Sequence, residues 1–238
     1  MNLLRFLGLT KKKTEKRQIN VAFEYGTHLP VLRSIVEVFH PRGVLELGAG
    51  KFSTPMFYQS VKHVVTVESD AKWIEEVAKT LPPREGFSLV HYARPGISGR
   101  TRLNALSQRQ KTEAVEYYQH LLAKNPGLDF LFIDHVSGLR AFTLAQLYDR
   151  FDFIVYHDAE EKGYGYEQFP YEQSGMYFHY ILQAYVPHTG FLIHKKFSAR
   201  LPEFLRILER NAQAYVIEHY RFDLKDLSEP RANTACAG

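Results

Sequence analysis

The stretch Val44-Leu45-Glu46-Leu47-Gly48-Ala49-Gly50-Lys51-Phe52-Ser53-Thr54 passes from a short apolar segment through a glycine turn toward a helix. Glycine allows the backbone to turn sharply and allows a ligand to approach closely. A second apolar segment ends in Val67-Glu68-Ser69-Asp70, so Glu68 follows the turn at a spacing of about twenty residues. An acid at this spacing can accept hydrogen bonds from ribose hydroxyls. The two segments therefore predict a nucleoside site.

Outward from the turn, short apolar runs alternate with helical patterns, which is typical of a parallel sheet covered by helices on both faces. The expected strands are Gly43-Leu47, His63-Val67, Phe87-Tyr92, Asp129-Ile133, Phe153-Tyr156, Gly190-His194 and Tyr215-His219. The expected helices are Leu29 to Phe39, Lys72 to Leu81, Gln108 to Lys124, Leu139 to Tyr148 and Leu201 to Ala212. The pattern predicts an α/β, doubly wound, mostly parallel sheet.

Length and composition favour one domain, because 238 residues with 45% hydrophobic content can bury one sizeable core. We expect that domain at 21–228, after a basic leader at 1–20 and before a flexible tail at 229–238. Much of the net charge of +4 lies in the leader, which is a candidate for peripheral membrane contact. The body lacks a distributed basic stripe, which disfavours nucleic acid as a partner.

The chain contains no apolar stretch of the roughly 18 residues that a membrane span requires, and no secretory signal pattern. Its single cysteine, Cys236, excludes an intrachain disulfide. Both observations predict a cytoplasmic protein.

The identity of the nucleoside follows from differences between the turn and the dinucleotide fingerprint. Ser53 stands where that fingerprint has its third glycine, and Glu46 places an acid before the first glycine. An acid there suits a cationic ligand better than a diphosphate. The residues resemble motif I of class I S-adenosylmethionine-dependent methyltransferases, with Glu68 at that family's ribose-binding acid.

This resemblance implies a seven-stranded, Rossmann-like methyltransferase sheet with an antiparallel last strand, and S-adenosylmethionine as cofactor. Glu46 would then hold the methionine end of the cofactor, and Ser53 or Thr54 would reach its carboxylate. The residues expected to bind the cofactor are Glu46, Gly48, Ala49, Gly50, Ser53, Thr54, Glu68, Ser69 and Asp134.

Two further strands each end in an acid beside a histidine: Asp134-His135 after the fourth and His157-Asp158 after the fifth. If the two strands are parallel neighbours, their ends meet beside the cofactor, so these four residues are the candidate catalytic group. Histidine can take a proton from a hydroxyl directly, whereas a divalent metal can acidify a bound hydroxyl instead. The sequence permits either mechanism.

The segment Leu128-Asp129-Phe130-Leu131-Phe132-Ile133-Asp134-His135 resembles the fourth-strand motif of catechol O-methyltransferases. That resemblance implies a magnesium or manganese site formed by Asp134, His157 and Asp158. The chain departs from the family at Ser137, which replaces the catalytic lysine, and at His157, which replaces an acid. The end Tyr156-His157-Asp158 also resembles glucuronoxylan O-methyltransferases, which act on sugar acids.

Three groups outside this centre are secondary candidates. His28 is expected to cap the first helix, with a contact to the methionine end or to substrate as the alternative. Three tyrosines could form a lid that stacks on a sugar or aromatic ring, or could pack their own loop; they are Tyr164, Tyr166 and Tyr171. Three arginines could pair with a substrate anion or remain solvated; they are Arg94, Arg100 and Arg102.

These features together predict an O-methyltransferase that acts on a hydroxyl of a small molecule or a carbohydrate. An NAD-dependent oxidoreductase on the same kind of sheet is the first alternative, although Ser53 and Glu46 disfavour it. A non-catalytic nucleoside-binding module is the second. The pattern predicts no particular oligomeric state.

Overall fold

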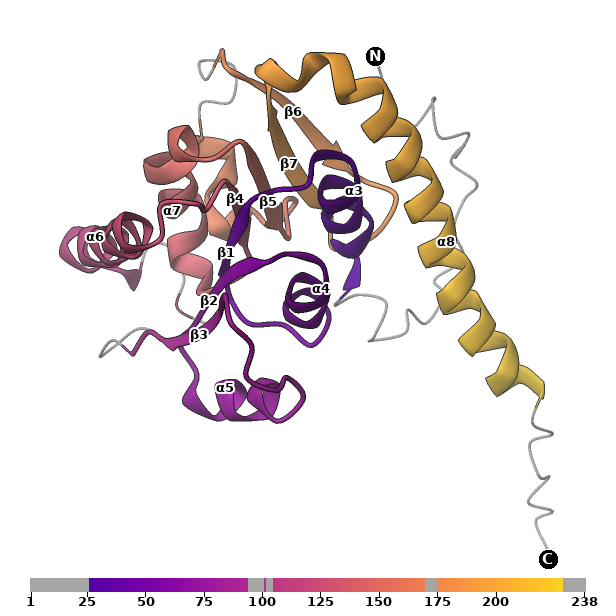
Figure 1. The fold of residues 1–238 in the computed structure, drawn as a ribbon, viewed down its shortest axis with the longest axis horizontal. Coiled ribbons are helices and arrows are strands. Elements are labelled where there is room, and N and C mark those ends of the chain that lie inside the picture. The colour runs from indigo at the N-terminus through magenta and orange to yellow at the C-terminus, as the bar shows by residue number, and fades with distance from the viewer. Residues whose placement is uncertain (1–25, 94–100, 102–104, 170–174, 229–238) are drawn as a thin grey trace, which may run out of the picture.

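The structure is a computed structural model that describes residues 26–93, 101, 105–169 and 175–228, with side chains described as far as residue 215 (Figure 1). The expected leader at 1–20 and tail at 229–238 lie outside the described residues. Four secondary candidates from the sequence also lie outside them, namely Arg94, Arg100, Arg102 and Tyr171.

Seven strands form one sheet in the order β3-β2-β1-β4-β5-β7-β6. The strands are β1 Gly43–Leu47, β2 His63–Glu68, β3 Phe87–His91, β4 Phe130–Ile133, β5 Phe153–His157, β6 Tyr177–Leu182 and β7 Thr189–His194. The first five strands pair in parallel, whereas β7 is antiparallel to both β5 and β6. This is a doubly wound, mostly parallel, seven-stranded sheet whose last strand is antiparallel, so the predicted fold class is confirmed.

The prediction of a strand at Tyr215-His219 is wrong, because these residues continue the helix α8, Leu201–Ser228. Valine and isoleucine at 216 and 217 favour a strand locally. However, glycine and proline are both absent from 203 to 229, so nothing interrupts the helix that begins at Leu201. The seventh strand is instead Tyr177–Leu182, which forms the edge of the sheet beside β7.

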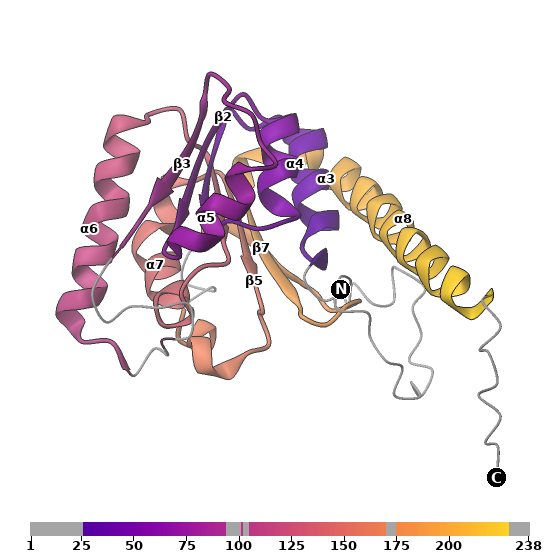
Figure 2. The ribbon, with the colours of Figure 1, turned by 90° about the horizontal axis from the view of Figure 1, so that it is seen from below.

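Helices cover the sheet on both faces, as Figure 2 shows: α3, α4 and α8 lie on one side, and α6 and α7 on the other. The shorter α5 packs along β2 and β3. These helices are α3 Leu29–Phe39, α4 Ser53–Ser60, α5 Ala71–Ala78, α6 Gln108–Lys124 and α7 Arg140–Leu147. Short 3-10 turns occur at Ser137–Leu139, Tyr148–Arg150, Lys162–Tyr164, Tyr166–Gln168 and Lys195–Arg200.

Alternation along the strands creates two separate cores. Successive residues of a strand face opposite sides of the sheet. In β4, Phe130 and Phe132 therefore pack beneath α3, α4 and α8, while Leu131 and Ile133 pack beneath α6 and α7. The same alternation decides the layer into which the polar residues beyond each strand point.

Among the residues that the structure describes, no helix combines the length and the hydropathy needed to cross a membrane.

Candidate cofactor and catalytic site

The glycine loop after β1 is held between the ends of β2 and β4. The Gly48 amide donates to the Val67 carbonyl at 2.8 Å, and the Asp134 amide donates to the Leu47 carbonyl at 2.7 Å. Gly48 has a φ of 97°, and a Cβ atom there would collide with the backbone carbonyl of Asp134. The loop thus takes a conformation that favours glycine, as the sequence predicts.

Glu46 is fully buried within β1 and faces the layer of α3 and α4. Its Oε2 accepts a hydrogen bond from Thr66 Oγ1 at 2.7 Å, whereas its Oε1 has no hydrogen-bond partner in the described part of the chain. Burial raises the pKa of the Glu46 carboxyl to about 7, against the opposing influence of the nearby Ser53, Thr66 and Thr54 hydroxyls. One carboxylate oxygen is therefore available to a buried donor.

Ser53 and Thr54 open α4 directly beyond the glycine loop and are both buried. Thr54 Oγ1 accepts from the Gly50 amide at 2.8 Å, which ties the loop to the first turn of the helix. The structure therefore brings together Glu46, the glycine loop and the start of α4, as expected from the sequence.

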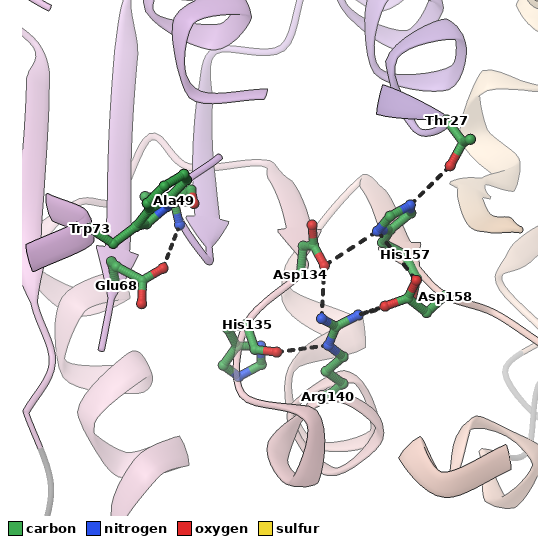
Figure 3. A network of polar contacts seen from close by, with 9 residues as sticks. All are labelled: Thr27, Ala49, Glu68, Trp73, Asp134, His135, Arg140, His157 and Asp158. Atoms are coloured by element: carbon green, nitrogen blue, oxygen red, sulfur yellow. Dashed lines mark hydrogen bonds and ion pairs between the residues drawn. The ribbon is translucent and has the colours of Figure 1, made fainter. Parts of the chain in front are cut away.

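Glu68 ends β2 and closes the other side of the glycine loop (Figure 3). Its Oε2 accepts from the Ala49 amide at 3.0 Å. Its Oε1 accepts from the amides of Ser69 and Asp70 at 2.5 and 2.9 Å. A carboxylate oxygen can accept two hydrogen bonds, so Oε2 keeps capacity for a ligand hydroxyl.

Trp73 is a neighbour of this acid that the sequence did not indicate. Its indole Nε1 donates to the Ala49 carbonyl at 2.5 Å, so the ring lies against the glycine loop (Figure 3). Asp70 holds the start of α5 in place by accepting from the amides of Lys72 and Trp73. Trp73 is the only tryptophan of the chain.

The ends of β4 and β5 lie side by side because Ile133 pairs with Tyr156 in the parallel register. The next residues of the two strands are Asp134 and His157, and both side chains extend into the layer of α3. Asp134 Oδ1 lies 3.4 Å from His157 Nδ1. The predicted meeting of these two residues is therefore observed.

Arg140, at the start of α7, binds both acids of the strand ends (Figure 3). Its Nη2 lies 2.8 Å from Asp134 Oδ1, and its Nη1 lies 2.7 Å from Asp158 Oδ2. Its Nε donates to the His135 carbonyl at 2.7 Å. Burial alone would raise the pKa of Asp134, but His157 and Arg140 hold it well below its usual range. Asp134 is thus ionised at neutral pH.

His157 is buried and contacts a polar partner on each side of its ring. Nε2 lies 3.0 Å from Thr27 Oγ1, while Nδ1 lies 3.6 Å from Asp158 Oδ1 as well as near Asp134. Burial would lower the pKa of His157, but the charges of Asp134 and Asp158 outweigh burial and raise it. The site therefore favours a positive charge at this imidazole.

His28 does not cap α3 as predicted, because its side chain makes no capping hydrogen bond. The ring is buried and lies edge-on to His157, with 4.8 Å between the ring centroids. Neither ring nitrogen has a hydrogen-bond partner among the residues that the structure describes. Burial, together with the neighbouring His157, lowers the pKa of His28 to about 3. The imidazole is therefore neutral near pH 7.

His135 and Asp158 are the chain neighbours of Asp134 and His157, but their side chains lie differently. The His135 ring packs against Tyr118 of α6, and burial lowers its pKa to about 3. Asp158 has a φ of 54°, and its carboxylate reaches the other acid through Arg140. Of the four predicted catalytic side chains, the structure groups Asp134, His157 and Asp158 and places the His135 ring in the α6 layer.

Two of the three predicted lid tyrosines are described. Tyr166 is buried and packs on Tyr156, with 4.5 Å between ring centroids, so it anchors its own loop. The Arg140 guanidinium lies 4.6 Å from the ring centroid of the half-buried Tyr164. Tyr164 thus borders the Asp/Arg/His group.

Arg140, Thr27 and Trp73 are the site residues that the sequence did not reveal. Arg140 lies six positions beyond Asp134 within an ordinary helical pattern, and no spacing rule separates it from a surface arginine. It stands between Leu139 and Ala141, in the segment that joins the two strands ending in an acid beside a histidine. This position is its only sequence signal. For Trp73, the closeness to Glu68 in the sequence is a signal that could have indicated it.

Neither a protein-family model nor a curated protein sequence matches this chain. Among solved structures, human methyltransferase-like protein 13 in complex with SAH is similar at 13% identity and a TM-score of 0.47, over 79% of this chain and 90% of that chain. A methyltransferase from Geobacter sulfurreducens is similar at 14% identity and a TM-score of 0.45, over 80% and 94% of the respective chains. N-methyltransferase NodS from Bradyrhizobium japonicum WM9 is similar at 12% identity and a TM-score of 0.45, over 73% and 96%. Likenesses of this size do not assign an activity to this chain.

Proposed function

We propose that the chain is an S-adenosylmethionine-dependent O-methyltransferase that acts on a hydroxyl of a small molecule or a carbohydrate. The observation that carries this proposal is the joint geometry of the glycine loop. Glu46 with one unpartnered oxygen, Gly48 closed against Asp134, and Glu68 on the Ala49 amide surround one strand end. In a parallel α/β sheet, ligands bind at this edge.

The residues present fit the proposed cofactor. Glu46 Oε1 offers an acceptor to the ammonium of its methionine end, and Glu68 Oε2 offers an acceptor to a ribose hydroxyl. Ser53 and Thr54, at the start of α4, lie where hydroxyls and helix amides can meet the cofactor carboxylate. When bound, the cofactor supplies an electrophilic methyl group on a sulfonium.

The strand ends supply the group that handles the acceptor proton. Asp134 has a side chain that is 26% exposed, whereas the His157 side chain is only 5% exposed. An acceptor hydroxyl therefore reaches Asp134 first and hydrogen-bonds to its carboxylate, which orients the oxygen. In the metal-free protein, the neutral form of His157 behind Asp134 takes the proton as the oxygen is methylated. Because Asp134 and Asp158 raise the pKa of His157, this step requires a pH at which the neutral form is populated. Arg140 keeps Asp134 ionised and in place.

A small-molecule or carbohydrate acceptor is supported by the aromatic border of the site. Tyr164 lies beside Arg140 and has a ring on which a sugar or aromatic acceptor can stack. The metal site inferred from Asp134, His157 and Asp158 is less well supported as a magnesium site. Arg140 already bridges the two carboxylates that a hard cation would need.

Calorimetric titration with S-adenosylmethionine tests the proposal. We expect saturable binding to the wild type, weakening of at least tenfold in Glu68→Ala, and no change in the control Glu116→Ala, an exposed acid on α6. Equal binding by Glu68→Ala and the wild type would contradict the assignment. Tight NADH binding would favour the oxidoreductase. Cofactor binding without methyl transfer to any hydroxyl acceptor of a broad panel would favour the binding module.

A further inference from the structure

Three potential metal ligands from three separate segments converge beside the strand ends. His28 precedes α3, Asp134 follows β4 and His157 ends β5. One ligand atom from each of these residues lies within 4.8 Å of the others. A metal about 2.0–2.2 Å from each of its ligand atoms holds them roughly 3.0–4.3 Å apart. Side-chain movements of about half an ångström are therefore sufficient for the three atoms to share one ion.

His28 supplies the observation that points to a ligand rather than to simple packing. It is 3% exposed, and neither of its ring nitrogens has a hydrogen-bond partner. Its ring is wedged between Phe132 and His157, at centroid distances of 4.9 and 4.8 Å. A buried imidazole without a partner carries a desolvation cost that coordination of a metal would remove.

The His157 ring is oriented as a ligand by Thr27 (Figure 3). A neutral His157 that donates from Nε2 to Thr27 Oγ1, at 3.0 Å, turns the Nδ1 lone pair toward Asp134 Oδ1, at 3.4 Å. Without a metal, Asp134 favours a proton on Nδ1, as the raised pKa of His157 shows. A metal ion can take the place of that proton, because a separation of 3.4 Å is usual for neighbouring ligands of one metal.

The charges of the group also favour a cation. Asp134 and Asp158 are both paired with the single guanidinium of Arg140, which leaves one negative charge that either a protonated His157 or a bound cation can balance. Arg140 Nη2 and His157 Nδ1 both lie near Asp134 Oδ1, and Oδ2 offers a second ligand atom to an ion. Asp158 is held by Arg140 through Oδ2, and it is not part of the group of ligand atoms that converge with His28. Arg140 and Thr27 would thus act as the hydrogen-bonding groups that orient the ligands.

We propose that His28, Asp134 and His157 form a binding site for a divalent transition metal such as cobalt or zinc, with two imidazoles and one carboxylate as ligands. This set differs from the sequence-based expectation, because His28 replaces Asp158. Imidazole nitrogen favours transition metals over magnesium, which prefers oxygen ligands. Binding of the ion is independent of the proposed methyl transfer. The role of the ion rests on that function: in the metal-loaded protein it would lower the pKa of an acceptor hydroxyl, so that the proton passes to solvent instead of to His157.

The test is titration of the full chain with Co²⁺ or Mg²⁺ alone, followed by calorimetry and by the visible absorption of bound cobalt. We expect one Co²⁺ per chain, Mg²⁺ affinity at least 100-fold weaker, and at least 100-fold weaker Co²⁺ binding in His28→Gln. The matched control is His135→Gln, which removes another imidazole whose buried ring nitrogens lack hydrogen-bond partners among the described residues, and it should change Co²⁺ affinity less than threefold. Asp158→Asn should weaken binding less than tenfold.

Absence of saturable Co²⁺ binding, equal affinity for Mg²⁺, or unchanged affinity in His28→Gln would overturn the proposal. If circular dichroism shows that His28→Gln is unfolded, paramagnetic shifts of ring protons in the Co²⁺-loaded wild type decide instead. The rings of His28 and His157 should both shift strongly, and an unshifted His28 ring refutes the site. Titration of the same samples with S-adenosylmethionine separates a failed metal site from a failed cofactor site.

Discussion

Gly48 and Asp134 pack backbone against backbone, so closely that a single added methyl group on Gly48 would overlap the Asp134 carbonyl. This contact joins the cofactor loop to the strand end that carries the acid. Because backbone atoms cannot rotate away as a side chain can, the contact fixes the distance between the two halves of the proposed site.

Gly48→Ala is therefore expected to destabilise the protein by about 2–4 kcal/mol, since it combines a positive φ of 97° with a backbone collision. Urea unfolding measures the loss. The matched control is Gly127→Ala, where a Cβ atom would meet only His63 Nδ1 at an ordinary contact of 3.7 Å. Equal stability of the two variants would show that the loop relaxes without cost.

Arg140→Ala should cost about 3–5 kcal/mol of unfolding free energy, because it leaves the carboxylates of Asp134 and Asp158 without their buried partner. Arg42→Ala is the control, since Arg42 pairs with Asp129 at 2.9 Å but its side chain is 71% exposed. An exposed pair contributes less than about 1 kcal/mol. Similar losses in chemical denaturation would mean that the Arg140 network is not a buried anchor.

Cofactor affinity should depend on pH through Glu46. Burial raises its pKa to about 7, and only the ionised carboxylate attracts the ammonium of the cofactor. Binding should therefore be constant above pH 7 and weaken toward about tenfold per pH unit below it. Calorimetry between pH 5.5 and 8.5 measures the slope. Glu46→Gln should bind more weakly at high pH and show no slope, whereas an unchanged slope would assign the titration to another group.

Trp73 should report cofactor binding by fluorescence, because its indole donates to the Ala49 carbonyl directly beside Glu68. It is the only tryptophan, so the signal has one source. Adding S-adenosylhomocysteine should shift or quench the emission, with a midpoint equal to the calorimetric dissociation constant. Trp73→Phe should lose the signal and retain calorimetric binding. If the Trp73 emission does not change while calorimetry shows saturation, the ligand binds away from this loop.

The metal-free protein should lose stability below pH 6.5 because of its buried imidazoles. Burial lowers the pKa of His135 to about 3, whereas an unfolded histidine titrates near 6.5. Between these values the unfolded chain binds more protons, so stability is fully present above pH 6.5 and falls as the pH decreases toward 3. The slope is about 1.4 kcal/mol per pH unit for each such histidine. His28 has the same depressed pKa and should act in the same sense.

His135→Phe isolates one contribution, because phenylalanine keeps a ring against Tyr118 but cannot bind a proton. Thermal unfolding at several pH values should show a shallower acid decline for this variant than for the wild type. Parallel curves would indicate that His135 is protonated in the folded protein at these pH values.

Local sequence patterns predicted the fold and part of the candidate site, and the physical reasons can be identified. The glycine loop, Glu68 and the acid-ended strands are local patterns, and parallel pairing of β4 and β5 necessarily brings Asp134 to His157. Arg140 and Thr27 join the site through tertiary contacts across 18 and 130 positions, and neither contact has a local signature. The strand at Tyr215 was mispredicted because local β propensity was overridden by an uninterrupted helix.

The alternation of Asp134 and His135 across β4 has a consequence for how this protein can change over time. The first residue of the pair supports the proposed chemistry in the α3 layer, while the second packs the α6 layer. The backbone of the strand end thus separates the two side-chain environments, and Arg140 joins them through the Asp134 carboxylate and the His135 carbonyl. A substitution that repacks the α6 side therefore need not alter the reactive side as long as Arg140 keeps its position.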